Sequence, residues 1–196
     1  MIYGDIERKK QFTKRKQQYT DYVNEHIRNV HNMYHFYMPV WMDYFGNGPI
    51  FGELDRIIED HDKSKFSDEE FGPYMRRFFP ENPVEKGTKL PATPDFNKAW
   101  LHHIQNNAHH PEHWCLYEEK DGEIIKTVFD MPETEIIALL CDWAAMSIYC
   151  HDTIWNYWEG AGKTKVLSDN TSKLIDYFVY KMKDYSETHE YNPADY

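Results

Sequence analysis

Histidine and carboxylate residues gather at three places in this chain of 196 residues. Five of the eleven histidines fall between His102 and His113, and the other two places are His61-Asp62 and Asp142. Imidazole and carboxylate groups suit Mn, Fe, Co, Ni and Zn, whereas softer metals prefer thiolates. These residue types therefore indicate a metal site, provided that the fold brings them together.

Helical periodicity separates two of the clustered histidines. Phe96, Trp100 and His103 recur on one apolar face, so His103 is expected to point inward. His102 falls on the polar face and is expected to be solvated. The helix is expected to fade near His110, because Pro111 disfavours helical geometry in the residue before it. The histidines that could then turn toward a common centre are His109, His110 and, with less support, His113.

The His61-Asp62 pair follows an expected helix with an apolar stripe. His61 continues the stripe of Leu54 and Ile58, so its ring is expected to lie in the core. A single inward histidine is usually a structural residue. Here Asp62 adjoins it and Lys65 follows three positions later. A buried carboxylate must be paired, protonated or bound to a metal, which favours a chemical role.

Asp142 lies within the most apolar segment of the chain. It follows the six apolar residues 136–141 and precedes Trp143. A helix of this composition is expected to be buried nearly all round, where an isolated ionised carboxylate would be very costly. Pairing with a buried Lys, Arg or Tyr remains the alternative to metal binding.

The number of candidate donors indicates what kind of metal site they could form. Five to six histidines and carboxylates exceed the four ligands of a closed structural zinc site. They fit one or two divalent transition-metal ions with open positions, where a metal-bound water becomes the nucleophile.

The elements that must position these residues are mostly helical. One domain is expected over residues 1–196, with an all-α fold and one small β-hairpin. The expected helices cover about 5–37, 50–61, a short stretch after the capping-box pattern at 67–70, 94–110, 132–149 and 168–185. The hairpin is expected over 115–119 and 123–129, and the proline-rich stretch 79–93 is expected to be a loop.

Charge and composition exclude several classes of partner. The net charge is −11, which is unsuited to binding a nucleic-acid backbone or an anionic membrane surface. No apolar run approaches the roughly 18 residues of a membrane span. The N-terminus lacks an apolar signal core, and the three cysteines lie in apolar surroundings. A cytoplasmic protein with reduced thiols is therefore expected.

The motifs together resemble the HD-domain superfamily of metal-dependent phosphohydrolases. His61-Asp-Lys-Ser-Lys65 is similar to the HD-x-x-K form of its signature, and His26 followed by Val30 resembles its first-helix histidine. Asp142, among small and apolar residues, resembles its last ligand. The resemblance covers about residues 20–150. The whole chain is also similar to an uncharacterised HD-like family of bacterial and phage proteins.

The resemblance implies a compact HD-type helical bundle with the hairpin as an insertion, and a phosphohydrolase acting on a small nucleotide or related metabolite. In this reading Asp62 bridges two ions and Lys65 stabilises charge on the substrate phosphate. The first ion would be held by His26, His61, Asp62 and Asp142, and the second by His103, His109 and His110.

Two other functions share the same donors. Some HD-fold proteins with HD-x-x-K are di-iron oxygenases acting on polyols or phosphonates, and the site could also serve a non-catalytic metal-binding or interaction protein. Only six positions separate His103 from His109, where better-known dinuclear members have a longer insertion, so the number of ions stays open. The Gly-Tyr-Pro motif of the cyclic-dinucleotide phosphodiesterases is missing.

Overall fold

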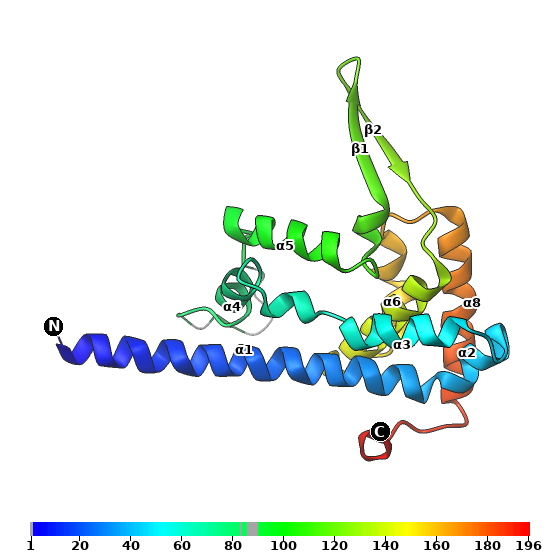
Figure 1. The fold of residues 1–196 in the computed structure, drawn as a ribbon, viewed down its shortest axis with the longest axis horizontal. Coiled ribbons are helices and arrows are strands. Elements are labelled where there is room, and N and C mark those ends of the chain that lie inside the picture. Colours follow the sequence, from blue (N-terminus) through cyan, green and yellow to red (C-terminus); the bar gives the residue numbers. More distant parts are fainter. Residues whose placement is uncertain (1, 83, 86–89) are drawn as a thin grey trace. The chain divides into compact units, whose positions relative to one another are not determined.

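The computed structural model describes residues 2–82, 84–85 and 90–196 (Figure 1). Its α-helices are α1 (Ile2–Phe36), α2 (Met38–Phe45), α3 (Ile50–Asp60), α4 (Phe71–Phe78), α5 (Pro94–Asn106), α6 (Glu133–Cys150), α7 (Ile154–Glu159) and α8 (Asp169–Ser186). Short 3-10 helices are η1 (Lys63–Phe66), η2 (Pro111–Trp114), η3 (Gly162–Thr164) and η4 (Pro193–Asp195). Strands β1 (Cys115–Lys120) and β2 (Glu123–Val128) form one hairpin. The expected helical class with a small hairpin is confirmed.

The chain divides into two compact units and passes between them three times. Unit 1 consists of Met1–Ile27 and Asp62–Asn107, and unit 2 of Arg28–His61 and Ala108–Tyr196. The first part of α1 therefore belongs to unit 1 and its end to unit 2. The single domain expected over residues 1–196 stays a prediction.

Unit 1 has a small aromatic core. Tyr19 and Val23, one helical turn apart on α1, are fully buried against Tyr74 and Met75 of α4 and Ala99 of α5. Side chains four positions apart share a helix face, so α1 presents this stripe to its two neighbours. The stripe fixes the side of α1 on which His26 also lies.

The start of α5 follows its sequence signals. The Thr93 hydroxyl accepts a hydrogen bond from the Phe96 amide at 3.3 Å, and Pro94 occupies the first turn, where its missing N–H is not needed. The expected N-cap is thus confirmed. The loop expected over 79–93 has no helix or strand in its described residues, and 83 and 86–89 lie outside them.

Unit 2 is built around α6, whose residues 136–141 are all buried. They form one core with the end of α1 and with α2, α3, α7 and α8. Helix α2 was not expected, because Pro39 was interpreted as ending the preceding helical run. Pro39 instead lies in the first turn of α2, a position that tolerates proline. Trp41 of this helix is fully buried.

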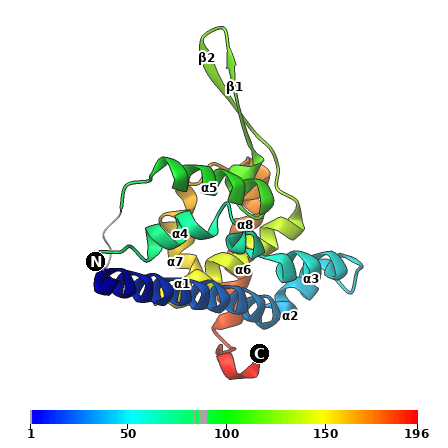
Figure 2. The same ribbon diagram turned by 60° about the vertical axis from the view of Figure 1, so that its left-hand side comes forward.

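The hairpin of unit 2 has the turn that its sequence predicts. Cys115 pairs with Val128 and Lys120 with Glu123, and Asp121 and Gly122 connect the strands with φ values of 55° and 81°. Positive φ at both positions is typical of the Asp-Gly type I′ turn. Both views show the hairpin extending away from the helices of its unit (Figures 1 and 2).

Within the described ranges, no helix is long and apolar enough to cross a membrane. The three cysteines, Cys115, Cys141 and Cys150, are free thiols.

Candidate metal centre

The His61-Asp62 pair forms the turn between α3 and η1. Helix α3 ends at Asp60, so His61 is just outside the helix that was expected to include it, with φ −50° and ψ 125°. Asp62 is left-handed, with φ 57°. Asp adopts this conformation more readily than most residues. Both residues are buried, with 2% and 1% of their surface exposed.

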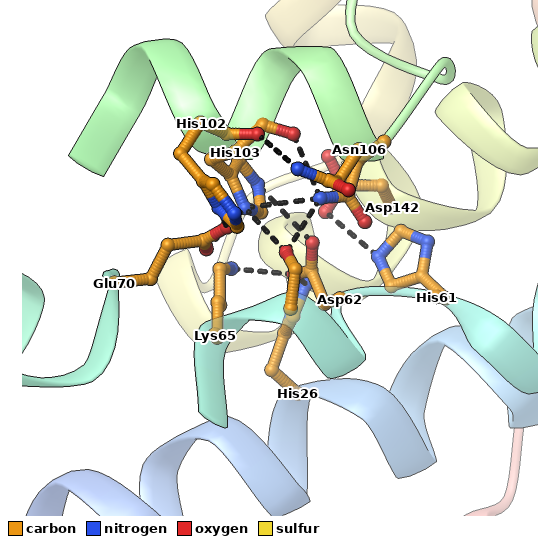
Figure 3. Close-up of polar contacts among 11 residues, drawn as sticks. His26, His61, Asp62, Lys65, Glu70, His102, His103, Asn106 and Asp142 are labelled. Atoms are coloured by element: carbon orange, nitrogen blue, oxygen red, sulfur yellow. Dashed lines mark hydrogen bonds and ion pairs between the residues drawn. The ribbon is translucent and has the colours of Figure 1, made fainter. Parts of the chain in front are cut away.

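In unit 1, the carboxylate of Asp62 lies close to the side chains of His26, Lys65 and His103 (Figure 3). Its Oδ1 lies 3.3 Å from Nε2 of His103, which comes from α5. Its Oδ2 lies 3.3 Å from Nε2 of His26, which comes from α1, and forms an ion pair with Nζ of Lys65. The two carboxylate oxygens therefore face histidines from two different helices.

The spacing of these atoms fits metal coordination. Two donors that each lie about 2.0–2.2 Å from one ion are roughly 3.0–3.5 Å apart, depending on the coordination geometry. The two distances of 3.3 Å between Asp62 and the histidines fall in this range. Typical N–H···O hydrogen bonds are shorter, about 2.9 Å. The donor positions of His26, Asp62 and His103 are therefore compatible with a bound ion.

Glu70 is a participant that the sequence did not reveal. Its carboxylate is fully buried, with Oε1 2.7 Å from Nδ1 of His102 and Oε2 2.8 Å from Nδ1 of His103. The capping box expected at residues 67–70 is not formed, because the residue at the N-cap position of α4 is Glu70 rather than Ser67. Glu70 caps α4 with its backbone only, and the Ser67 hydroxyl has no hydrogen-bond partner among the described residues.

The carboxylates change the proton affinity of this cluster. Burial by itself lowers the pKa of His103, but the interaction with the carboxylates of Asp62 and Glu70 outweighs it, so that the pKa is raised. Burial likewise raises the pKa of Glu70, but the bonds to His103 and His102 outweigh it, so that the pKa is lowered. Glu70 is therefore an ionised acceptor at neutral pH.

The two histidines of α5 differ in exposure, in the order that periodicity predicts. His103 is buried, with 1% of its surface exposed, and its ring packs against Trp100 and Tyr74. The His102 side chain is one-third exposed. Of the two, His103 is therefore the residue that reaches Asp62.

Unit 2 holds the other candidate ligands. Nε2 of His61 lies 4.0 Å from Oδ1 of Asp142 on α6. The His61 ring stacks on His109 with centroids 4.2 Å apart, and the His109 and His110 rings are 4.3 Å apart. The Asp142 side chain is 14% exposed, so it lies at the edge of the buried face rather than in the middle. His113 is exposed, with its ring against a neighbouring tryptophan.

Histidine and aspartate groups that could bind a metal ion occur among the described residues, and they include His26, His61, Asp62, His109 and His110. In unit 1 the candidate donors are His26, Asp62 and His103, with Lys65 beside them. In unit 2 they are His61, His109, His110 and Asp142, of which His110 and Asp142 are half-buried. This donor set suits a divalent transition-metal ion.

Comparison with known proteins places the chain in a family but gives it no activity. No curated protein and no solved structure matches it. One family profile, described as a family of unknown function (DUF5662), matches residues 15–181. This match spans most of the chain and every candidate ligand from His26 to Asp142. The chain therefore belongs to DUF5662, a family of unknown function.

Proposed function

We propose that the chain is a metal-dependent phosphohydrolase that acts on a small phosphate ester, such as a nucleotide or a related phosphorylated metabolite. The observation that carries this proposal is the environment of Asp62. One carboxylate oxygen faces His103, and the other faces His26 and Lys65. Such a carboxylate is suited to bridge two ions, or to hold one ion beside a lysine that binds substrate.

We propose that these histidine and aspartate donors hold one or two divalent ions of Mn, Fe, Co, Ni or Zn, the metals that imidazole and carboxylate groups suit.

The chain's own residues would do the following in hydrolysis. Asp62, the histidines and Asp142 would hold the ions, which when bound lower the pKa of a water and offset phosphate charge. Lys65 has three N–H donors and a side chain that is 16% exposed. Its Nζ would donate to a phosphate oxygen and stabilise the negative charge that develops there. In a chain of net charge −11, such local positive charge is needed to bind a phosphate.

Two further observations agree with the proposal. The resemblance of His61-Asp-Lys-Ser-Lys65 to the HD-x-x-K signature favours the same reaction class. The free thiols Cys115, Cys141 and Cys150 are compatible with a reducing compartment, so we place the proposed reaction in the cytoplasm.

Metal content is the first test. Tag-free protein expressed with ample metal is compared with the double variant His61→Ala/Asp142→Ala and with His113→Ala, which removes an exposed histidine. We expect one or two ions of Mn, Co, Ni or Zn per chain in the wild type and the control, and loss from the double variant. A phosphate-release screen on the loaded protein then tests the activity. Lys65→Met should keep the metal and lose turnover.

The other outcomes separate the alternatives. About two iron ions per chain, lost from the double variant, would overturn the hydrolase in favour of an HD-fold di-iron oxygenase. Bound metal without any turnover, with unfolding on chelation, would favour a non-catalytic metal-binding protein. Absence of metal from the wild type would overturn the proposal and leave His61 and Asp142 as structural polar residues.

A further inference from the structure

The strongest unassigned feature of unit 1 is the fully buried carboxylate of Glu70. A buried ionised carboxylate is very costly unless charged or polar partners compensate it. Here the partners are the Nδ1 atoms of His102 and His103, at 2.7 and 2.8 Å. Its neighbour Glu69 is exposed. Glu70 is therefore held in place by two consecutive histidines of α5.

These contacts decide which nitrogen of His103 carries the proton. An ionised carboxylate only accepts hydrogen bonds, so Nδ1 of His103 must donate to Glu70. In a neutral imidazole the other nitrogen, Nε2, then carries the lone pair. That nitrogen faces Asp62 at 3.3 Å.

Two other polar groups lie near the same Nδ1 atom. The Ser64 hydroxyl is 3.3 Å away and the Asn107 amide nitrogen 3.2 Å away. Asn107 also donates to Ser64 at 2.7 Å and to the His103 carbonyl at 2.8 Å, so its N–H groups have other acceptors. The shorter, charge-assisted bond to Glu70 therefore fixes the tautomer.

The ring of His103 is also fixed in orientation. Tyr74 packs against it with a centroid distance of 5.6 Å, and Trp100 with one of 5.8 Å. This packing keeps the ring in place, and the hydrogen bond to Glu70 prevents a ring flip that would swap the positions of Nδ1 and Nε2. In many metalloproteins a carboxylate hydrogen-bonds in this way to a histidine that binds the metal.

We propose that Glu70 is a positioning residue of the metal centre, which commits Nε2 of His103 to the ion by accepting the Nδ1 proton. This inference rests on the metal centre proposed above. His102 has a different role, because it anchors the other Glu70 oxygen and thereby sets the direction of the carboxylate.

The test is the metal affinity of Glu70→Gln, which removes the charge with little change in shape. Zn²⁺ is titrated into the metal-stripped wild type, Glu70→Gln and the matched control Glu69→Gln, with circular dichroism to verify the fold. We expect Glu70→Gln to bind Zn²⁺ about 10 to 100 times more weakly and Glu69→Gln to bind as the wild type does. His102→Ala keeps the charge, and its loss of affinity should be smaller than that of Glu70→Gln.

Nitrogen NMR of the imidazole groups gives a readout that needs no metal. At a pH where the His103 imidazole is neutral, the metal-free wild type should carry its proton on Nδ1, and Glu70→Gln should shift this equilibrium toward the other tautomer. A neutral wild-type imidazole with its proton on Nε2 would overturn the inference, as would equal Zn²⁺ affinity of Glu70→Gln and the wild type. In both cases the metal centre itself would stand. A wild type that binds no Zn²⁺ would overturn both, so the two failures are distinguishable.

Discussion

The donor sets of the two units are held in different ways. In unit 1 the histidine nitrogens lie 3.3 Å from a carboxylate that is paired with Lys65, and His103 is held from behind by Glu70. In unit 2 the contact between His61 and Asp142 is 4.0 Å, the His61 ring stacks on His109, and the His110 ring lies against His109. Short contacts between histidine and carboxylate thus characterise the donors of unit 1, and contacts between rings characterise those of unit 2.

This difference has a consequence for metal binding. Groups that are already fixed lose little freedom when an ion binds, so the unit 1 donors need little rearrangement. In unit 2 the contact between His61 and Asp142 is longer, at 4.0 Å. We therefore expect an ion to order unit 2 more than unit 1, and four predictions follow from this expectation.

The largest effect is expected for Asp62→Asn. Asn tolerates the left-handed backbone at φ 57°, so the change removes charge without adding strain. The ion pair between Asp62 and Lys65 is then lost, and the free energy of unfolding should fall by roughly 3 kcal/mol, the lower end for a broken buried ion pair. Metal binding should also be lost. Denaturant unfolding and metal analysis measure the two effects.

The control for this variant is Asp121→Asn in the hairpin turn. Asp121 has almost the same backbone angle, φ 55°, but is exposed. Its substitution should change the stability by less than about 0.5 kcal/mol. Equal losses at both positions would mean that the backbone, rather than the charge of Asp62, accounts for the effect.

The second prediction concerns metal addition. Zn²⁺ at about 100 times its dissociation constant should raise the free energy of unfolding by about 2.7 kcal/mol. Hydrogen exchange should slow more in the peptides around His109 and Asp142 than in those around Asp62 and His103. The same addition of Zn²⁺ should leave the free energy of unfolding of the Asp62→Asn variant unchanged. Greater slowing in unit 1 would contradict the comparison.

The third prediction is that Asp142→Asn separates metal binding from stability. The Asp142 side chain is partly exposed and 4.0 Å from His61, so its charge should contribute no more than about 1 kcal/mol to the fold. Metal content should nevertheless fall. A destabilisation as large as that of Asp62→Asn would show that the two donor sets are equally organised by charge.

The smallest effects are expected at two matched helix caps. Thr93 caps α5 in unit 1 and Thr153 caps α7 in unit 2, each accepting an amide hydrogen bond at 3.3 Å. Replacement of either by Ala should cost about 1 kcal/mol of stability. Thr93 lies ten residues before His103, about 15 Å along the helix, so its loss should leave Zn²⁺ affinity unchanged. A drop in affinity with Thr93→Ala alone would show that α5 frays as far as the site.

Periodicity was enough to predict several features of the site. The spacing of Phe96, Trp100 and His103 distinguishes the buried histidine from His102, because a helix repeats its faces every three to four residues. The hairpin follows from Asp-Gly between two extended segments. These features depend on local sequence, which is why they could be read from it.

The features that were missed depend on distant partners or on position within a turn. Glu70 matches a local capping pattern, yet its carboxylate turns toward histidines more than thirty residues later in the chain. Pro39 was interpreted as a helix breaker, although its place in the first turn of α2 allows it. Helix α3 likewise ends one residue before His61, because His61 and Asp62 leave the helical conformation, although the apolar stripe continues to His61.

The division of the chain also sets an order of events during synthesis. Unit 1 is complete once Asn107 has been made, whereas unit 2 needs the residues up to 196. Because chains are synthesised from the N-terminus and domains form as units, the first unit has its full complement of residues well before the second. His26, Asp62 and His103 therefore exist together on the ribosome before Asp142 has been added to the chain.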